Sequence, residues 1–487
     1  MLSKFFGKAP VRSARARFAR LNLESLESRE TPAGGVVTAN VVGGTLTLTG
    51  DNNAAGNHVR LLSFGVGAFD VQGQNGTLVR LGAGAPAGSV NVTGVTLDIR
   101  ANFFDGPDRF EYTQLNEFAL RDVYLTMGKG NDTILIAGGF IDCRNITITQ
   151  NALDVGNDST TITNPLGNNG GIRGFININN GQGNDTTILS VKATGNVTVA
   201  SQTGNDVTRI EGASYIGGSV LVTNTTGAIG NDTRIQGTTH ISKNLTVTNG
   251  NQEQINQILG ACVIGGNVVF ASGNAGGGTT QNNVNNAVIG GTFTATGTGG
   301  QNWTNITNSR VGRTVTINSG PGNAFDTLNN STVGGSYISN KGAGNDNLTI
   351  NSSAIYGNLT LSMGATSMFG ANVVDIDNSS VYGTTTITAT TGEDRVFIDT
   401  SRFIGAVNIN TGAANDVVEI GVGGGTNTFF YSTLTVALGT GVDQLRVGTG
   451  SSIRVTGNTA YSGILGETLI DNVNPFANVY LGTRTVS

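Results

Sequence analysis

Apolar residues along most of this chain come in pairs separated by one polar residue, after a small or turn residue that is often Gly. The apolar residues stand two and four places after that start, as in Val197 and Val199 or, in the first copy, Leu97 and Ile99. Strict alternation rich in β-branched residues predicts a strand with one buried face. Fifteen copies give a mean period of about 24 residues, with starts at 95, 121, 144, 174, 195, 218, 243, 266, 291, 313, 335, 357, 383, 405 and 432.

A second signal follows many of these starts by about eleven to fourteen residues. It is the triplet Gly-Asn-Asp or a relative of it, and another short apolar segment such as 134–136 comes after it. Gly adopts positive φ at no cost, and Asn and Asp bond back to the backbone in turns. Each unit therefore predicts strand, turn, strand, turn. The triplets end at Asp132, Asp158, Asp185, Asp206, Asp232 and Asp346, and looser relatives end at Asp108, Asp326, Asp394, Asp416 and Asp443.

A unit of this length excludes several repeat folds. It is too short for a propeller blade, too long for a nonapeptide calcium roll, and has no leucine-rich-repeat signature. The pattern predicts an all-β, right-handed parallel β-helix, a β-solenoid of about 15 or more coils, each stacked on the next at ~4.8 Å. We expect repeats over 95–455, a cap or irregular first coils over 36–94, and a C-terminal cap over 456–487.

Composition supports an extended, glycine-punctuated β protein. Gly accounts for 74 of 487 residues, charged residues for only 12%, and Pro for only 7 residues, which excludes collagen and Pro-rich linkers. No apolar run approaches the ~20 residues of a membrane-spanning helix, so no transmembrane segment is expected. Net charge is −5, and a basic head over 1–35 leaves the rest more acidic still. An acidic body argues against nucleic acid as a partner.

The basic head contains no uninterrupted apolar stretch, so it does not match a conventional signal peptide. Its segment 20–33 reads RLNLESLESRETPA. This segment resembles the L-x-L-E-x-L-E-x-R-x-x-P-A leader of large exported proteins of planctomycete bacteria. The Gly-Asn-Asp repeats with short strands, over about 36–455, are similar to β-solenoid surface proteins of the same bacteria. The resemblance implies that 1–35 is an export leader, disordered or a short helix, and that the protein is extracellular or lies at the cell surface.

Residues able to perform catalysis are sparse. The two histidines, His58 and His240, are far apart in sequence, and no nucleophile elbow, phosphate loop or zinc-protease motif occurs. We therefore predict no catalytic and no cofactor-binding residues, and expect His240 to be a solvated turn residue. Cys143 and Cys262 lie five copies apart, so we expect both to be unbridged.

A carbohydrate-active β-helix enzyme remains the alternative. Such enzymes need a local group of carboxylates with Arg or Lys on one face, whereas the aspartates here follow the repeat. Aromatic runs at 103–104 and 429–431 suit stacking on sugars, but we expect them to pack in the core or a cap.

The aspartates that end successive triplets are the candidate metal ligands. Stacking would place their carboxylates ~5 Å apart, where calcium bridges would offset their repulsion. The competing hypothesis, which we favour, is that each Asp caps its own turn and points into solvent. The middle coils, roughly 243–313, have Asn or Gln instead, which would interrupt a row of ions. The candidate calcium ligands are Asp108, Asp132, Asp158, Asp185, Asp206 and Asp232.

The sequence thus favours a non-enzymatic, exported structural or adhesive rod that presents repeated Asn/Thr-rich faces. Its expected partners are cell-envelope or matrix components, glycans among them. A carbohydrate-active enzyme and a calcium-stabilised surface repeat protein are the two alternatives.

Overall fold

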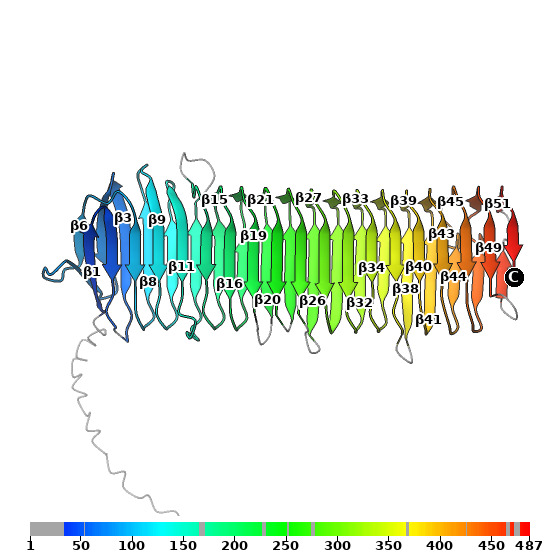
Figure 1. The fold of residues 1–487 in the computed structure, drawn as a ribbon, viewed down its shortest axis with the longest axis horizontal. Coiled ribbons are helices and arrows are strands. Elements are labelled where there is room, and N and C mark those ends of the chain that lie inside the picture. Colours follow the sequence, from blue (N-terminus) through cyan, green and yellow to red (C-terminus); the bar gives the residue numbers. More distant parts are fainter. Residues whose placement is uncertain are drawn as a thin grey trace, which may run out of the picture.

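The computed structural model describes residues 34–487 except 53, 165–170, 226–229, 251–252, 274–277, 367–369, 425, 464–467 and 472–477. The segment 20–33 that resembles an export leader lies outside the described residues. The described chain is all-β and forms a β-solenoid of about 15 turns with ~24 residues per turn, as predicted (Figure 1). It contains no helix with the length and hydrophobicity needed to cross a membrane.

Three parallel sheets run along the rod. The first contains β1 (Val36–Val42), β2 (Thr45–Thr49), β5 (Leu78–Leu81), β7 (Ile99–Asn102), β9 (Leu120–Thr126), β11 (Cys143–Thr149), β13 (Ile176–Asn179), β16 (Val197–Ser201), β19 (Val220–Asn224), β22 (Leu245–Asn249), β25 (Val268–Ser272), β28 (Phe293–Gly297), β31 (Val315–Ser319), β34 (Tyr337–Asn340), β37 (Leu359–Ser362), β40 (Thr385–Thr388), β43 (Val407–Asn410), β46 (Leu434–Ala437), β49 (Thr459–Ser462) and β52 (Arg484–Val486).

The second sheet contains β3 (His58–Gly65), β4 (Ala68–Gly73), β6 (Ser89–Val92), β8 (Arg109–Gln114), β10 (Thr133–Ala137), β12 (Ser159–Thr163), β14 (Thr186–Ser190), β17 (Val207–Ile210), β20 (Asn231–Gln236), β23 (Gln254–Leu259), β26 (Thr279–Asn285), β29 (Gln301–Thr307), β32 (Ala324–Asn329), β35 (Asn347–Asn351), β38 (Ala371–Asp377), β41 (Glu393–Asp399), β44 (Val417–Ile420), β47 (Gln444–Val447) and β50 (Thr468–Asp471).

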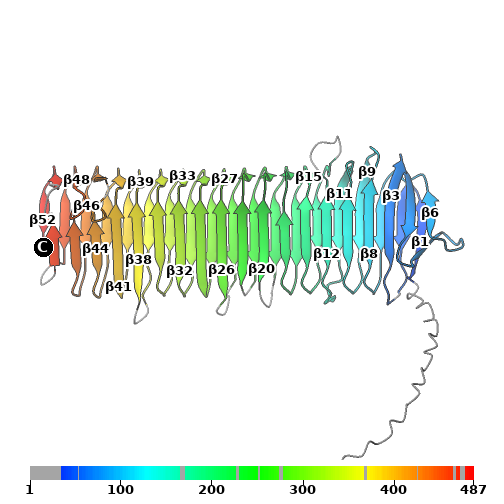
Figure 2. The ribbon, with the colours of Figure 1, turned by 180° about the vertical axis from the view of Figure 1, so that it is seen from behind.

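The third sheet is made of much shorter strands: β15 (Lys192–Ala193), β18 (Tyr215–Ile216), β21 (His240–Ile241), β24 (Val263–Ile264), β27 (Val288–Ile289), β30 (Arg310–Val311), β33 (Thr332–Val333), β36 (Ala354–Ile355), β39 (Ser380–Val381), β42 (Arg402–Phe403), β45 (Thr428–Phe430), β48 (Ile453–Val455) and β51 (Val479–Tyr480). In both ribbon views these strands follow one upper edge of the rod (Figures 1 and 2).

A regular coil therefore has three strands, not the two that the sequence predicts. One turn passes from β16 to β17 to β18, and β19 then pairs in parallel with β16. The third strand was missed because most of its copies are two residues long and bury a single side chain, such as Ile216. A strand with a single buried residue produces no alternating apolar and polar pattern in the sequence.

The paired apolar residues face the core, as predicted. Val220 and Val222 are fully buried and stand in register with Val197 and Val199 of the coil before. The first copy is the exception. Ile99, not Leu97, occupies the first inward place, because Ile99 pairs with Val123. Both cysteines are buried and free, as predicted.

The two ends of the rod differ. At the N-terminus β1 pairs with β2, β3 with β4, and β4 with β6 in antiparallel fashion, unlike the coils that follow. These hairpins stack on the first coils through parallel pairs of β2 with β7 and β3 with β8. At the C-terminus β49 pairs with β46 and β52 pairs with β49, both in parallel. The first-sheet ladder therefore continues past residue 455.

The Gly-Asn-Asp triplet forms the corner between the first and second sheets. Gly204 has φ +142°, and a Cβ there would lie 1.6 Å from the carbonyl oxygen of Gly183 in the coil before. Only glycine fits so close an approach. Asn184 accepts a hydrogen bond from the backbone N–H of Asn205 in the next coil, at 2.8 Å. The corner is thus closed between coils and not within one coil.

Candidate functional site

Five of the six predicted calcium ligands stand in one row along this corner. The sixth place belongs to Asn231, because Val207 pairs with Asp232 and the row runs one residue earlier. Asp232 instead forms an ion pair with Arg234 at 2.7 Å, so its placement in the row was wrong. Asp326 also leaves the row and lies inside the rod. The row contains Asp108, Asp132, Asp158, Asp185 and Asp206, then Asn231, Gln254, Thr280, Asn302 and Ala324, then Asp346, Asn372, Asp394, Asp416 and Asp443.

Each carboxylate in the first run accepts a backbone N–H from the same position one coil earlier. Asp132 accepts from Asp108 at 2.8 Å, Asp158 from Asp132 at 2.8 Å, and Asp185 from Asp158 at 3.0 Å. In this run Asn131, Asn157 and Asn184 bond toward the next coil, and the Asp of each triplet bonds toward the previous one. The expectation of a cap on its own turn is therefore corrected: these carboxylates link coils.

These carboxylates are also buried, not solvent-facing as expected. Asp132 is 1% exposed and Asp158 is 2% exposed. In each, Oδ1 accepts the backbone bond, while Oδ2 is buried with no hydrogen-bond partner among the described residues. A buried acceptor that lacks a partner costs free energy, and a charged one costs more.

Burial favours the neutral acid, so it raises the pKa of every carboxyl in the first run. The pKa rises to about 6 for Asp108 and Asp185, about 7 for Asp158 and Asp206, and about 8 for Asp132. At Asp132, Asp158 and Asp206, neighbouring aspartates add to this rise. The first run therefore takes up protons near neutral pH, and neighbouring carboxyls within it titrate as coupled groups.

One carboxylate cluster is close enough for a metal ion. Asp132, Asp154 and Asp158 each offer an oxygen, and these oxygens lie within 4.8 Å of one another. Asp154 comes from the loop before the triplet and accepts backbone N–H groups from Gly130 and Gly156. Calcium takes six to eight oxygens. Because several oxygens of this cluster already accept backbone bonds, the described side chains leave such a shell incomplete.

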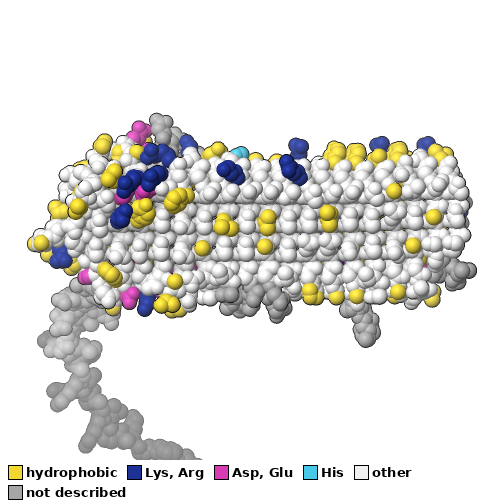
Figure 3. All heavy atoms as spheres, viewed as in Figure 1, with side chains coloured by type: hydrophobic (Ala, Val, Ile, Leu, Met, Phe, Trp, Pro, Cys, Tyr) yellow, Lys and Arg dark blue, Asp and Glu magenta, His cyan; other side chains and the backbone are white. Residues whose placement is uncertain are grey.

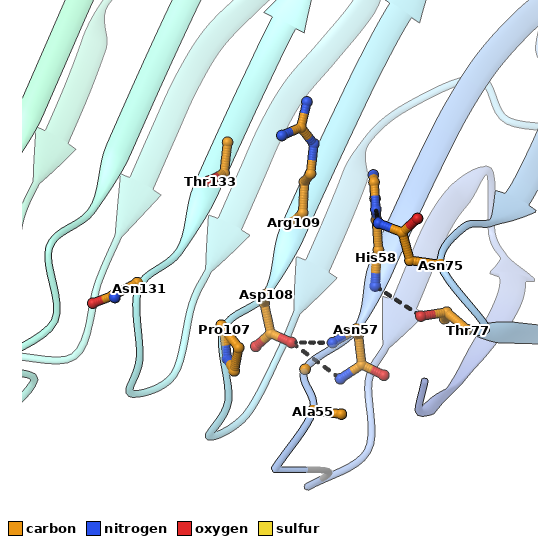
Figure 4. Close-up of a pocket in the computed structure, with 11 residues that line it drawn as sticks. Ala55, Asn57, His58, Asn75, Thr77, Pro107, Asp108, Arg109, Asn131 and Thr133 are labelled. Atoms are coloured by element: carbon orange, nitrogen blue, oxygen red, sulfur yellow. Dashed lines mark hydrogen bonds between the residues drawn. The ribbon is translucent and has the colours of Figure 1, made fainter. Parts of the chain in front are cut away.

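A hollow of about 220 Å³ opens at the first coils and contains His58 and Asp108 (Figure 4). Asn75 bonds to Nδ1 of His58 at 2.8 Å, and Glu111 lies 3.3 Å from Nε2. Burial lowers the pKa of His58, against the opposing effect of Glu111. Both ring nitrogens are engaged, so the ring presents neither a free base nor a free acid to the hollow.

His240 is not the solvated turn residue that the sequence predicts. It lies on β21, and its ring stacks on Tyr215 of the preceding coil, with centroids 5.2 Å apart and planes 3° apart. A short third strand carries it, which is why the sequence pattern placed it in a turn.

A charged group on the first coils also departs from expectation. Arg121 bonds to Asp98 at 2.8 and 2.5 Å, and Arg144 bonds to Asp122 at 3.1 and 2.6 Å. Arg100 lies 4.9 Å from the ring centroid of Tyr124. From the sequence, the aspartates of the body are expected to follow the triplet repeat. Asp98 and Asp122 do not follow it. The pairing register of successive coils brings these residues together. Because Asp98, Asp122 and the arginines are spread over 47 residues of sequence, no local motif reveals the group.

The chemistry of this charged group is that of ion pairs. Burial alone would raise the pKa of Asp122, but hydrogen bonds from Arg144 and Asn145 outweigh it and hold that pKa below its ordinary value. A general acid of a glycosidase needs a raised pKa. Asp122 therefore suits an anchor for arginines better than a proton donor.

Comparisons with known protein families, with curated proteins and with solved structures find no match for this chain.

Proposed function

We propose that this protein is an exported, non-enzymatic structural or adhesive rod of the cell surface. The observation that supports it is the outer face of the first sheet. No strand of this sheet from β13 to β49 contains a charged residue, and Thr and Asn recur at the outward positions. Figure 3 shows a broad face with few charged side chains beyond the first coils.

The second sheet provides the contrast. Its outward positions carry charges of both signs, such as Glu419 and Arg446, which pair at 2.9 Å. A mixed, solvated face of this kind keeps a protein soluble. The first-sheet face instead repeats uncharged hydroxyl and amide groups at the coil spacing of ~4.8 Å.

The proposed mechanism is geometric. Each outward Thr or Asn offers one weak donor or acceptor, and a rigid rod holds many of them at fixed spacing. A repetitive partner in the cell envelope or matrix would engage several groups at once, so avidity replaces strong single contacts. Function then depends on the continuity of the face and not on one residue.

Two experiments test this proposal. Cell fractionation with proteolysis of intact cells should place the protein at the surface, and full protection inside the cell would contradict the proposal. Co-sedimentation with isolated cell envelope should weaken when Thr316 and Thr360 are both changed to Lys. The matched control places lysines at Thr327 and Thr349, outward positions of the second sheet, and should leave sedimentation unchanged.

A carbohydrate-active enzyme is the second candidate, supported by the charged group of Arg121, Arg144, Asp98 and Asp122 on one face. Incubation with acidic polysaccharides tests it directly. Release of reducing or unsaturated sugar that Arg121→Ala abolishes would favour the enzyme over the rod.

A further inference from the structure

One corner position changes its residue type along the rod. Immediately after the short third strand, the backbone N–H bonds to the third strand of the previous coil. In the middle coils this residue is mostly glycine, at Gly265, Gly290, Gly312 and Gly334. Farther along the same position holds Tyr356, Tyr382, Ile404 and Tyr431. A large side chain, aromatic at three of these four positions, thus replaces glycine on neighbouring coils while the same backbone hydrogen bond is kept.

These tyrosines are exposed, and the first two stack on each other. Tyr356, Tyr382 and Tyr431 are 55%, 45% and 43% exposed, which is high for aromatic side chains. The rings of Tyr356 and Tyr382 are nearly parallel, at 8°, with centroids 4.7 Å apart. Figure 3 shows hydrophobic side chains gathered along the upper edge toward the C-terminal end, with Lys or Arg beside them.

Arginines stand beside the tyrosines. Arg402, Phe429 and Arg454 occupy the same outward position on β42, β45 and β48. Arg402 lies 4.7 Å from the centroid of the Tyr431 ring, a cation–π contact. A hollow of about 140 Å³ is lined by Phe429, Tyr431 and Arg454. Phe430, between them, is buried, so of the aromatic run 429–431 only this residue is fully buried as expected.

The charge of this sheet has one sign. The third-sheet strands β15 to β51 contain no Asp or Glu, although the body of the protein is acidic. Among the described residues, Arg402 and Arg454 form no ion pair. Asp377 and Asp399 end second-sheet strands across the corner, and Asp399 accepts the backbone N–H of Gly423 instead of an arginine. Two cations therefore remain available to an anionic ligand.

We infer that this Tyr–Arg stripe, made of Tyr356, Tyr382, Arg402, Phe429, Tyr431 and Arg454, binds an acidic polysaccharide laid along the rod axis. Aromatic faces provide the flat apolar contact that the C–H face of a sugar ring requires, and guanidinium groups bind carboxylates through two parallel hydrogen bonds. The inference rests on the proposed function for its setting, and deepens it by naming a ligand class and a place on the rod.

The test uses the purified full-length chain in affinity electrophoresis with polygalacturonate as the probe. The wild-type protein should be retarded, and retardation should weaken as salt screens the exposed arginines. The first double variant, Tyr356→Gly with Tyr382→Gly, restores the glycine that earlier coils have at this position. The second, Arg402→Thr with Arg454→Thr, introduces the residue that β33 has there, Thr332. Each pair should reduce affinity at least tenfold. The matched control is Arg310→Thr, on β30 of the same sheet but beside Gly312, and it should bind like wild type.

Three results would overturn the inference: no retardation of the wild type, equal retardation by uncharged dextran or by polyglutamate, or equal loss in the Arg310→Thr control. Circular dichroism and thermal unfolding of each variant separate lost binding from lost folding, and the arginine pair is exposed and should fold normally. If the protein does not bind polygalacturonate, the surface-proteolysis and envelope co-sedimentation results still decide the proposed function independently. Conversely, binding by a protein that proves to be intracellular would contradict only the proposed function.

Discussion

The corner row of the rod has two kinds of coil. Toward both ends the corner acceptor is Asp, in a first run from Asp108 to Asp206 and again from Asp394 to Asp443. From Asn231 to Ala324 the row contains no acid. The backbone follows the same parallel ladder through both regions. A charged acceptor is therefore not required to stack coils.

In the middle coils, where the corner row has no Asp, a stack of uncharged Asn side chains lies just inside the corner. Asn249 donates to Asn256 at 2.9 Å, and Asn256 donates to Asn282 at 2.9 Å. These amides are buried and satisfy one another without charge. The difference teaches that the corner row is sensitive to protons in its first run, where burial raises the carboxyl pKa values, whereas its positions from Asn231 to Ala324 carry no titratable group.

The largest effect should come from a charge placed in the apolar ladder. Val222→Asp buries a carboxylate between Val199 and Val247, where no partner exists, and should cost about 4 kcal/mol or more. Thr223→Asp, one residue on and facing outward, should cost less than about 1 kcal/mol. Chemical denaturation measures both. Equal tolerance of the two changes would contradict the register.

A buried ion pair marks the border between the acid-free middle and the C-terminal end. Nζ of Lys341 lies 2.5 Å from Asp326, and both side chains are 0% exposed. Lys341→Met should cost about 3–5 kcal/mol, because it leaves Asp326 unpaired. In the next coil, Leu348 is in register with Asp326. Ser362 is in register with Asn340, so Met363 occupies the place that corresponds to Lys341. The double change Asp326→Leu with Lys341→Met should therefore recover most of the loss. A double variant no more stable than the single one would contradict this account.

Exchange of acid and amide in the row tests the comparison in both directions. The native pKa of Asp206, about 7, exceeds the unfolded value of about 3.9, so stability falls as pH rises between the two. Asp206→Asn should therefore stabilise the protein at pH 8 by about 1–3 kcal/mol and change little at pH 4. Asn231→Asp, the matched reverse, should destabilise at pH 8 only. Effects of the same size at both pH values would show that proton binding is not the cause.

Calcium should have the smallest effect. The row closes its corners through backbone bonds, so thermal unfolding in EDTA and in millimolar calcium should agree closely. An ion held by the cluster at Asp132, Asp154 and Asp158 would instead raise the melting temperature with calcium concentration. Asp154→Asn is the informative control. A rise of many degrees that this variant loses would favour a calcium-stabilised rod.

Features with a visible period were predictable from the sequence. The inward pairs, the coil length and the Gly-Asn-Asp corner repeat often enough to be read directly. The burial of Asp132 was not predictable, because it depends on the coil that stacks above it. Asp232 shows the limit most clearly. Its triplet is intact, yet the register of the neighbouring strands places Asn231 in the row.

The Tyr–Arg stripe was invisible for a related reason. Tyr356 and Tyr382 are 26 residues apart, and only the register of β36 and β39 brings their rings together. Coils of unequal length shift such positions relative to a fixed period. Surface sites on this rod therefore emerge from strand pairing and not from motifs.

Hydrogen exchange resolved by segment, at pH 5 and at pH 8 with correction for intrinsic rates, tests the central claim most directly. Segments of a solenoid open separately, so each reports its own stability. The account predicts that second-sheet strands β10, β12 and β14 lose protection at pH 8, where pKa values of about 6 and 7 leave Asp185 and Asp158 largely ionised and a pKa of about 8 leaves Asp132 about half ionised. Strands β23, β26 and β29, with Gln254, Thr280 and Asn302 in the row, should keep the same protection at both pH values. Equal loss in the two regions, or no loss in either, would contradict it.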